Sequence, residues 1–265
     1  MWVLYAYMRW CDDLADDPQQ PVSVRVARLQ AWKHSVQQAL DTGVAEHPIL
    51  LALVSVARRY ALKTHWLTAV IDGGCQELHQ PVFSTLLEWE EYCFQVAGAV
   101  GMCCLAIWDY QGQQREELAR ICGQAFQRTN MLRDLFEDLK QGKCFLPDPE
   151  WQQHRLSPQE LLEPGFSSSD PRYQTFMADQ CNKARHDFMR AKALEEGLPP
   201  ASRAVFRCMW QIYYELLQRI EASGYSLQHK RVKLSAWRKG CIVWHAWRHR
   251  HVLTLMPNSA DLSYL

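Results

Sequence analysis

The sequence predicts an all-α protein, and two observations support this fold class. Apolar residues recur at spacings of three and four along most of the 265 residues, as expected for helices that bury one face. Strand signals are nearly absent, because we find no hairpin turn and no sustained alternation of Val, Ile or Thr with polar residues. A hydrophobic content of 48% is enough for a substantial core. Basic and acidic residues are equal in number, at 29 each, so we expect no nucleic-acid partner.

The first predicted helices lie in the amino-terminal half of the chain. Residues 22–40 carry a single apolar stripe at helical spacing. Residues 84–109 begin with Ser84, which can cap a helix, and become apolar on all sides after Tyr92. The apolar part, residues 93–108, is shorter than the roughly 18 to 20 residues that cross a bilayer. We therefore predict a buried central helix and no transmembrane helix.

Three long helices are predicted in the carboxy-terminal half. They cover residues 113–139, 171–196 and 199–223, with Gly and Pro residues at their boundaries. The irregular stretch 148–170 could be a linker between two domains, but neither side of it holds a self-sufficient set of motifs. We interpret it as a surface loop of one domain that spans residues 1–265.

The ten cysteines are interpreted as reduced residues of the core, with a metal site as the alternative. They contain no Cys-x-x-Cys pair. The amino terminus runs into a charged segment at residues 9–17, where a secretory signal would be apolar. The sequence thus predicts a cytoplasmic protein in a reducing compartment.

A first acidic cluster lies close to the amino terminus. Asp12 and Asp16 are four residues apart, so on a helix their carboxylates share one face, with Asp13 beside them. Carboxylates in this arrangement repel each other. A solvated acidic helix end is the alternative, but the surrounding Tyr7 and Trp10 make it less favourable.

A second acidic cluster repeats this geometry. Gln127, Asn130, Asp134 and Asp138 are separated by three, four and four residues, so four oxygen-bearing side chains line one helical stripe. An adjacent apolar stripe would hold the helix in a core and partly desolvate the acids. Oxygen ligands without His or Cys favour Mg²⁺, which commonly binds through a substrate diphosphate as well. Two clusters with the same spacing predict a magnesium-dependent site.

At these motifs the sequence resembles the squalene and phytoene synthase family, whose members join two prenyl diphosphates head to head. The family's first aspartate element is matched by Tyr5, Arg9, Asp12, Asp13 and Asp16, and its second by Gln127, Asn130, Arg133, Asp134, Glu137 and Asp138. Its Tyr-Cys-x-x-Val-Ala-Gly-x-Val-Gly element recurs from Tyr92 to Gly101, and its closing signature resembles residues 220–225 and 231–235.

The resemblance implies a single-domain helical bundle around a central cavity that binds two prenyl diphosphates. It implies Mg²⁺ ligands at Asp12, Asp16, Asn130, Asp134 and Asp138. The catalytic residues that it implies are Tyr92, Arg9 and Arg133. Substrate contacts are implied for Asp13, Gln127, Glu137, Lys143, Gly98, Gly101, Tyr225 and Arg231. For Tyr92 a purely structural role in the core, and for the two glycines helix packing, are the alternatives.

The resemblance leaves the product open. We favour two farnesyl diphosphates and a presqualene diphosphate or squalene-type product, as in hopanoid or carotenoid biosynthesis. Phytoene synthesis from geranylgeranyl diphosphate, and a non-catalytic assembly or scaffold role, are the alternatives. We find no glycine-rich dinucleotide loop, so NADPH is not supported as a cofactor.

Three features depart from the family pattern. The family's Gly-Arg-x-Tyr-Leu-Pro element reads Gly142-Lys-Cys-Phe-Leu-Pro here, so Lys143 replaces an arginine and Phe145 lacks a hydroxyl. A usual Met-x-Met-Asp element ends instead in Glu77, which keeps the acid. The first aspartate motif lies close to Met1, so we expect the domain to lack the usual amino-terminal helix.

The segment 230–251 carries a hypothesis of its own. It contains seven Lys or Arg and no acidic residue, interleaved with Trp237, Trp244 and Trp247. Such a segment could lie on an anionic membrane surface, where prenyl substrates reside. A solvated basic helix whose tryptophans pack on the core is the alternative. The histidines at 245, 249 and 251 resemble a metal-binding tract only superficially.

Overall fold

The computed structural model describes residues 1–79, 81–228, 231–249 and 251, and every regular element among them is helical. A π-helical turn, Phe94–Gly98, joins two of the helices, and two short 3₁₀ turns lie at Glu160–Leu162 and Lys192–Glu195. The helices are α1 (Trp2–Ala15), α2 (Val22–Thr42), α3 (Pro48–Tyr60), α4 (Thr64–Leu78), α5 (Leu86–Cys93), α6 (Ala99–Ile107), α7 (Arg115–Lys140), α8 (Asp148–Gln153), α9 (Pro171–Ala191), α10 (Pro200–Ala222) and α11 (Ala236–Arg248).

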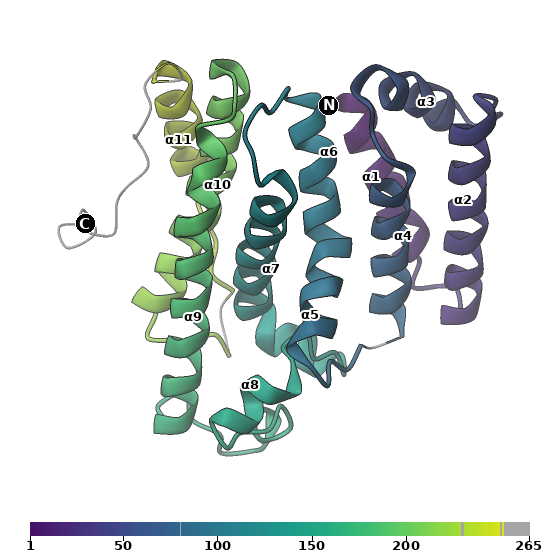
Figure 1. Cartoon of the computed structure of the whole chain (residues 1–265). Helices are drawn as coiled ribbons and strands as arrows, with labels where there is room; N and C mark the ends of the chain where they lie inside the picture. Colours follow the sequence, from purple (N-terminus) through teal and green to yellow (C-terminus); the bar gives the residue numbers. More distant parts are fainter. Residues whose placement is uncertain (80, 229–230, 250, 252–265) are drawn as a thin grey trace.

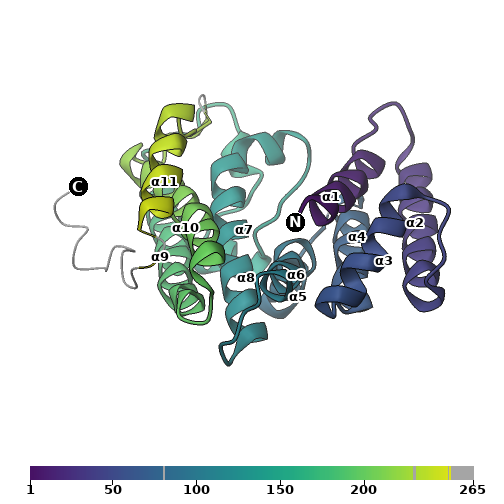
Figure 2. The ribbon, with the colours of Figure 1, turned by 90° about the horizontal axis from the view of Figure 1, so that it is seen from above.

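The long helices stand side by side, as Figure 1 shows, with α5 to α7 in the middle of the molecule. On one side, α1 packs against α2, α3 and α4. On the other side, α7 packs against α9, α9 against α10, and α10 against α11. The view from above in Figure 2 shows the same division, with α1 and α7 on opposite sides of the α5–α6 axis. The two predicted acidic helices therefore come from different sides of the molecule.

The central helical run matches the prediction of a buried central helix. Leu86–Ile107 is long and apolar enough to cross a membrane by length and composition, and half of its most apolar window is buried inside the protein. Its π-helical turn and α6 pack against α4 on one side and α7 on the other. A core helix of a helical bundle has this placement, because it packs against helices on two sides.

The start of α5 differs from the prediction. Thr85, rather than Ser84, is the cap, because its side chain accepts a hydrogen bond from the Glu88 backbone N–H at 3.2 Å. The Glu88 carboxylate in turn accepts the Thr85 N–H at 3.2 Å, which completes a capping box. The box requires an acid or amide three residues after the cap, and Glu88 has that spacing from Thr85 only.

Other predicted boundaries need smaller corrections. The helix predicted for residues 171–196 ends at Ala191 and continues as a 3₁₀ turn. The stretch 148–170, predicted as a loop, contains α8 and another 3₁₀ turn. Helices α3 and α4 carry buried apolar faces that the pattern analysis had not singled out. All ten cysteines are free thiols and seven of them are buried, in agreement with the reduced-core interpretation.

Candidate active site

Helix α1 holds its acidic residues off the packed core because its other side is buried. Leu4, Tyr7 and Cys11 are buried, and the Tyr7 hydroxyl donates a hydrogen bond to the Leu67 carbonyl of α4 at 2.8 Å. Asp12 and Asp16, on the opposite face, remain accessible to solvent. The pKa of Asp12 is raised, first because the surrounding protein desolvates its carboxylate and second because Asp16 repels it.

Helix α7 presents the second acidic stripe next to its buried side. Leu135 and Leu139 are buried, while Asp134 and Asp138 are half-buried beside them. Burial, with the charge of Asp134 as the second cause, raises the pKa of Asp138 to about 7. The predicted desolvation of this stripe is therefore observed in the folded chain.

Asp134 is the acid of this stripe that two guanidinium groups neutralise. Arg133 donates from Nε at 2.8 Å and from a terminal nitrogen as well. Arg231, from the segment before α11, approaches within 2.6 Å through Nε. Burial alone would raise the pKa of Asp134, but these hydrogen bonds outweigh it and lower the pKa. Arg231 also lies 3.7 Å from Glu137, so it contacts two acids of the motif.

The turn after α7 places Lys143 beside Asp138. Gly142 adopts the left-handed conformation with φ 74°, which allows the chain to fold back over the last turn. The Gly142 N–H then donates to the Leu139 carbonyl, and the Lys143 N–H donates to the Asp138 carbonyl, both at 2.9 Å. The charge of Lys143 lowers the pKa of Asp138 and so partly offsets the effect of burial.

Glu77, at the end of α4, is within electrostatic range of acids from both motifs. Burial is the main reason that its pKa is raised, and the charges of Asp12 and Asp16 on α1 raise it further. Glu77 in turn contributes to the raised pKa of Asp138 on α7. Carboxylates from three helices therefore share one electrostatic environment, with the Lys143 charge acting on both Glu77 and Asp138.

Tyr92 is tied to this cluster by a hydrogen bond. Its hydroxyl donates to the Glu77 carboxylate at 2.7 Å, and burial raises its pKa well above the usual value. Its ring stacks on Phe145, with centroids 5.9 Å apart, and contacts Phe83 at 5.0 Å. Glu77 is an acid that the family pattern retains, although it is not among the predicted site residues. Its partner Tyr92 is fifteen residues away on another helix, so the spacing of residues within one helix cannot predict the contact.

The remaining predicted site residues lie in different surroundings. Arg9 pairs with Asp13 at 2.8 Å on the exposed face of α1, and Gln127 is half-buried on α7. Tyr225 follows the end of α10, where its carbonyl accepts a hydrogen bond from Tyr173 at 3.0 Å. None of the contacts described for Tyr225 involves either acidic motif.

The backbones of the two predicted glycines, Gly98 and Gly101, lie next to α7. A Cβ atom at Gly123 would lie only 2.8 Å from the Gly98 nitrogen, so the backbones approach closely there. At Gly101, an added Cβ would meet Ala119 at 3.8 Å, an ordinary contact. These distances favour the packing alternative at Gly98, and room for a substrate chain stays a prediction.

The oxygen donors of the two motifs suit a hard divalent cation. The Asn130 side-chain oxygen is buried and has no hydrogen-bond partner, as a ligand atom awaiting a cation would. The other donors are carboxylates, which Mg²⁺ prefers. Within residues 1–79, 81–228, 231–249 and 251, no three His, Cys, Asp or Glu side chains converge closely enough to hold an ion by themselves.

Comparisons with known proteins cover most of the chain. The family model for squalene/phytoene synthase matches residues 1–238. The chain is 32% identical over 256 residues to the 15-cis-phytoene synthase of Synechococcus elongatus, covering 91% of this chain and 80% of that protein. It is 30% identical over 234 residues to the presqualene diphosphate synthase of Zymomonas mobilis, covering 88% and 78%. A crystal structure of a dehydrosqualene synthase matches with a TM-score of 0.79 at 23% identity, covering 94% of this chain and 85% of that one. The predicted fold is confirmed.

Proposed function

The chain belongs to the squalene/phytoene synthase family, and from this premise we propose that it condenses two prenyl diphosphates head to head with release of diphosphate. The observation that supports this most directly is the cluster around Glu77. The charges of acids on α1 and of Asp138 on α7 are both coupled to the Glu77 carboxyl, and this coupling supports the proposal that the two aspartate motifs act on one substrate. Charges that repel in the free protein are stabilised once cations and a diphosphate are bound.

The proposed roles follow from the positions of the side chains. Mg²⁺, when bound through Asp12, Asp16, Asn130, Asp134 and Asp138, would neutralise the diphosphate and make it a better leaving group. Lys143, Arg133 and Arg231 add positive charge around the second motif. Arg9 adds a further charge on α1.

Tyr92 is our candidate for orienting the diphosphate, or for relaying the proton released as a cyclopropane ring closes: its oxygen accepts that proton while its own hydroxyl proton passes to the Glu77 carboxylate. Glu77 holds its hydroxyl in place, and Phe145 and Phe83 hold its ring. Because the hydrogen bond and the ring packing already hold the hydroxyl in position, it loses little conformational freedom when a substrate binds. The aromatic surroundings also keep water away from a carbocation.

For the donor we propose farnesyl diphosphate, with presqualene diphosphate as the first product. The similarity to the presqualene diphosphate synthase of Zymomonas mobilis supports this choice. The comparable similarity to the phytoene synthase of Synechococcus elongatus supports geranylgeranyl diphosphate as the second candidate. The two differ in the length of the prenyl chain, so a direct comparison of donors decides between them.

The test is incubation with Mg²⁺ and each donor in turn, with the products identified by mass spectrometry. We expect one condensation product from the farnesyl donor and a fall in rate of about 100-fold or more in Asp12→Asn and Asp138→Asn. Asp41→Asn, an exposed acid on α2, is the matched control and should retain the parent rate. A parent protein inert with both donors would contradict the proposal and favour the assembly or scaffold role.

A further inference from the structure

We propose that the outer face of α11 docks on an anionic lipid surface. The helix is anchored to the body of the protein by its inner face. Ile242 and Ala246 are buried, and α11 packs along α10. Arg238 donates two hydrogen bonds to Glu215 of α10, at 2.7 and 2.8 Å. The Ser235 hydroxyl accepts the Arg238 N–H and caps the helix. Because these contacts hold α11 in place, its outer residues form a preformed surface.

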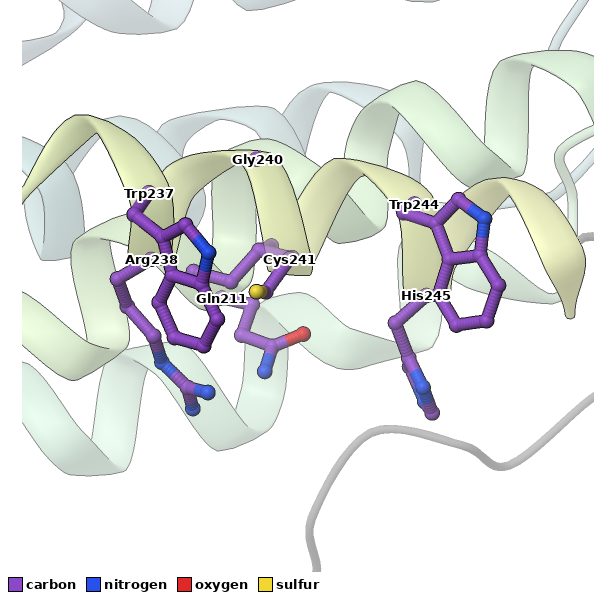
Figure 3. Close-up of a pocket in the computed structure, with 8 residues that line it drawn as sticks. Gln211, Trp237, Arg238, Gly240, Cys241, Trp244 and His245 are labelled. Carbon is purple, nitrogen blue, oxygen red and sulfur yellow. The ribbon is translucent and has the colours of Figure 1, made fainter.

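Three tryptophans lie on that outer face. Trp237, Trp244 and Trp247 are 78%, 61% and 56% exposed. They are separated by seven and three residues, so they share one stripe of the helix, opposite Ile242 and Ala246. Figure 3 shows Trp237 and Trp244 projecting from the ribbon of α11. The sequence-based alternative, that these tryptophans pack on the core, is therefore not what the structure shows for this stripe.

A shallow cavity of about 630 Å³ lies beside this stripe. Trp237, Cys241, Trp244 and His245 of α11 line it together with Gln211 of α10 (Figure 3). Tryptophan rings are amphipathic and are enriched at the headgroup level of membranes, where an apolar body and a polar N–H both find partners. Several exposed tryptophans on one helix face are typical of a surface that meets such an interface.

The charge around the stripe selects an anionic surface. The sequence has no Asp or Glu from Leu227 to His251. Arg248 is exposed beside the stripe, and its guanidinium lies 5.1 Å from the centre of the Trp244 ring. Lys233 and Lys239 are also exposed, near the start of α11, although Lys239 lies on the side of the helix that carries Ile242. Basic residues beside an aromatic stripe bind anionic headgroups while the rings enter the interface. A neutral apolar partner would need no basic residues beside the tryptophans, so we propose an anionic bilayer as the partner. Lys230 and Arg250 of the original hypothesis lie outside the described residues.

The surface adjoins the candidate active site. A cavity of about 260 Å³ is lined by Arg133 and Arg231, which bind Asp134, and also by Lys239 of α11. If the proposed function holds, a bilayer against α11 would lie close to the second aspartate motif and to substrates that partition into lipid. The docking itself does not depend on that function, because it is measured without substrate.

The test is flotation of the full chain with vesicles made from equal parts of phosphatidylglycerol and phosphatidylcholine, or from phosphatidylcholine alone. We expect binding to the anionic vesicles that weakens as salt is added. Trp237→Ser combined with Trp244→Ser should lower the partition coefficient at least about tenfold, and Lys239→Glu combined with Arg248→Glu at least about fivefold. Leu51→Ser with Arg59→Glu on α3, at the other end of the molecule in Figure 1, is the matched control and should bind as the parent does.

A second measurement separates docking from loss of fold. Lipids with brominated acyl chains should quench tryptophan fluorescence in the parent, and the quenching should decrease in the Trp237→Ser, Trp244→Ser variant. A parent that does not float with anionic vesicles would overturn the proposal. So would a tryptophan variant that binds as well as the parent. Sedimentation that shows a dimer abolished by the same tryptophan substitutions, without vesicle binding, would identify a second copy of the chain as the occupant instead.

Discussion

At the residue scale, the contact between Tyr92 and Glu77 links the aromatic and acidic parts of the candidate site. Helical periodicity predicted neither partner of this contact, because it reports which face of a helix is buried and not which helix faces it. Tyr92 was recognised only through a motif resemblance, and Glu77 was noted as a departure from one. Their hydrogen bond, at 2.7 Å, makes Glu77 the residue that sequence reasoning ranked too low.

We predict that Tyr92→Phe lowers the rate of condensation about 10- to 100-fold while the protein stays folded. Phe retains the stacking on Phe145, and the lost hydrogen bond costs about 1 kcal/mol of unfolding free energy. Steady-state kinetics and urea unfolding measure the two effects.

Tyr110→Phe is the matched control for this prediction. Its hydroxyl, also on a buried tyrosine, donates to the Gln113 carbonyl at 3.1 Å away from the acidic cluster. We expect Tyr110→Phe to lose about as much stability as Tyr92→Phe while its condensation rate stays that of the parent. Equal rates for both variants and the parent would show that the Tyr92 hydroxyl takes no part in the reaction.

At the element scale, the position of α7 depends on close backbone approach and on one buried ionic cluster. Gly123 allows α7 to touch the π-helical turn, and Arg128 extends from α7 to Glu150 of α8 and Gln180 of α9. Helix α7 was predictable from the sequence, because its apolar stripe and the Gly142 that follows it are local signals. The sequence did not predict the cluster, whose members are far apart in the chain.

Gly123→Ala should lower the unfolding free energy by about 1 to 3 kcal/mol. The added Cβ would lie 2.8 Å from the Gly98 nitrogen, a backbone atom that cannot rotate away. Gly101→Ala is the control, because its Cβ would make an ordinary contact with Ala119 and alanine favours a helix. Thermal unfolding measures the stability of each variant relative to the parent. A Gly123→Ala protein as stable as Gly101→Ala would rule out the close approach.

Glu150→Ala should destabilise the protein by about 3 to 5 kcal/mol, because it leaves the Arg128 charge buried and uncompensated. Side chains of both residues are about 5% exposed or less. Glu116→Ala, which removes an exposed i,i+4 pair with Arg120, should cost below about 0.5 kcal/mol. Urea denaturation monitored by circular dichroism distinguishes the two, and equal costs would mean that Arg128 finds another partner.

At the scale of the whole molecule, the acidic motifs lie on α1 and α7, which are on different sides of the central helices in Figure 2, and the charges of both motifs are coupled to Glu77. The chain supplies oxygen donors on each side but, among the residues described, no three acids that converge to hold an ion unaided. Mg²⁺ keeps few protein ligands and commonly binds through substrate phosphates. Metal and diphosphate are therefore expected to bind together.

We predict that Mg²⁺ and inorganic diphosphate added together raise the melting temperature more than the sum of their separate effects. A ligand at 100 times its Kd adds about 2.7 kcal/mol of stability. Differential scanning fluorimetry of the parent and of Asp138→Asn measures this, with EDTA reversing the shift. A full shift with Mg²⁺ alone would show a preformed metal site, and an unchanged shift in Asp138→Asn would exclude that residue as a ligand.

The sequence by itself determined the helical fold class, the central apolar helix and the two acidic stripes. These features depend on local spacing, since one turn of helix brings residues three and four apart onto one face. Only the tertiary structure decided that Tyr92 donates a hydrogen bond to Glu77, that Arg231 reaches Asp134, and that the tryptophans of α11 face outward. These features depend on contacts between distant segments, which arise from the packing of whole helices and leave no periodic signal in the chain.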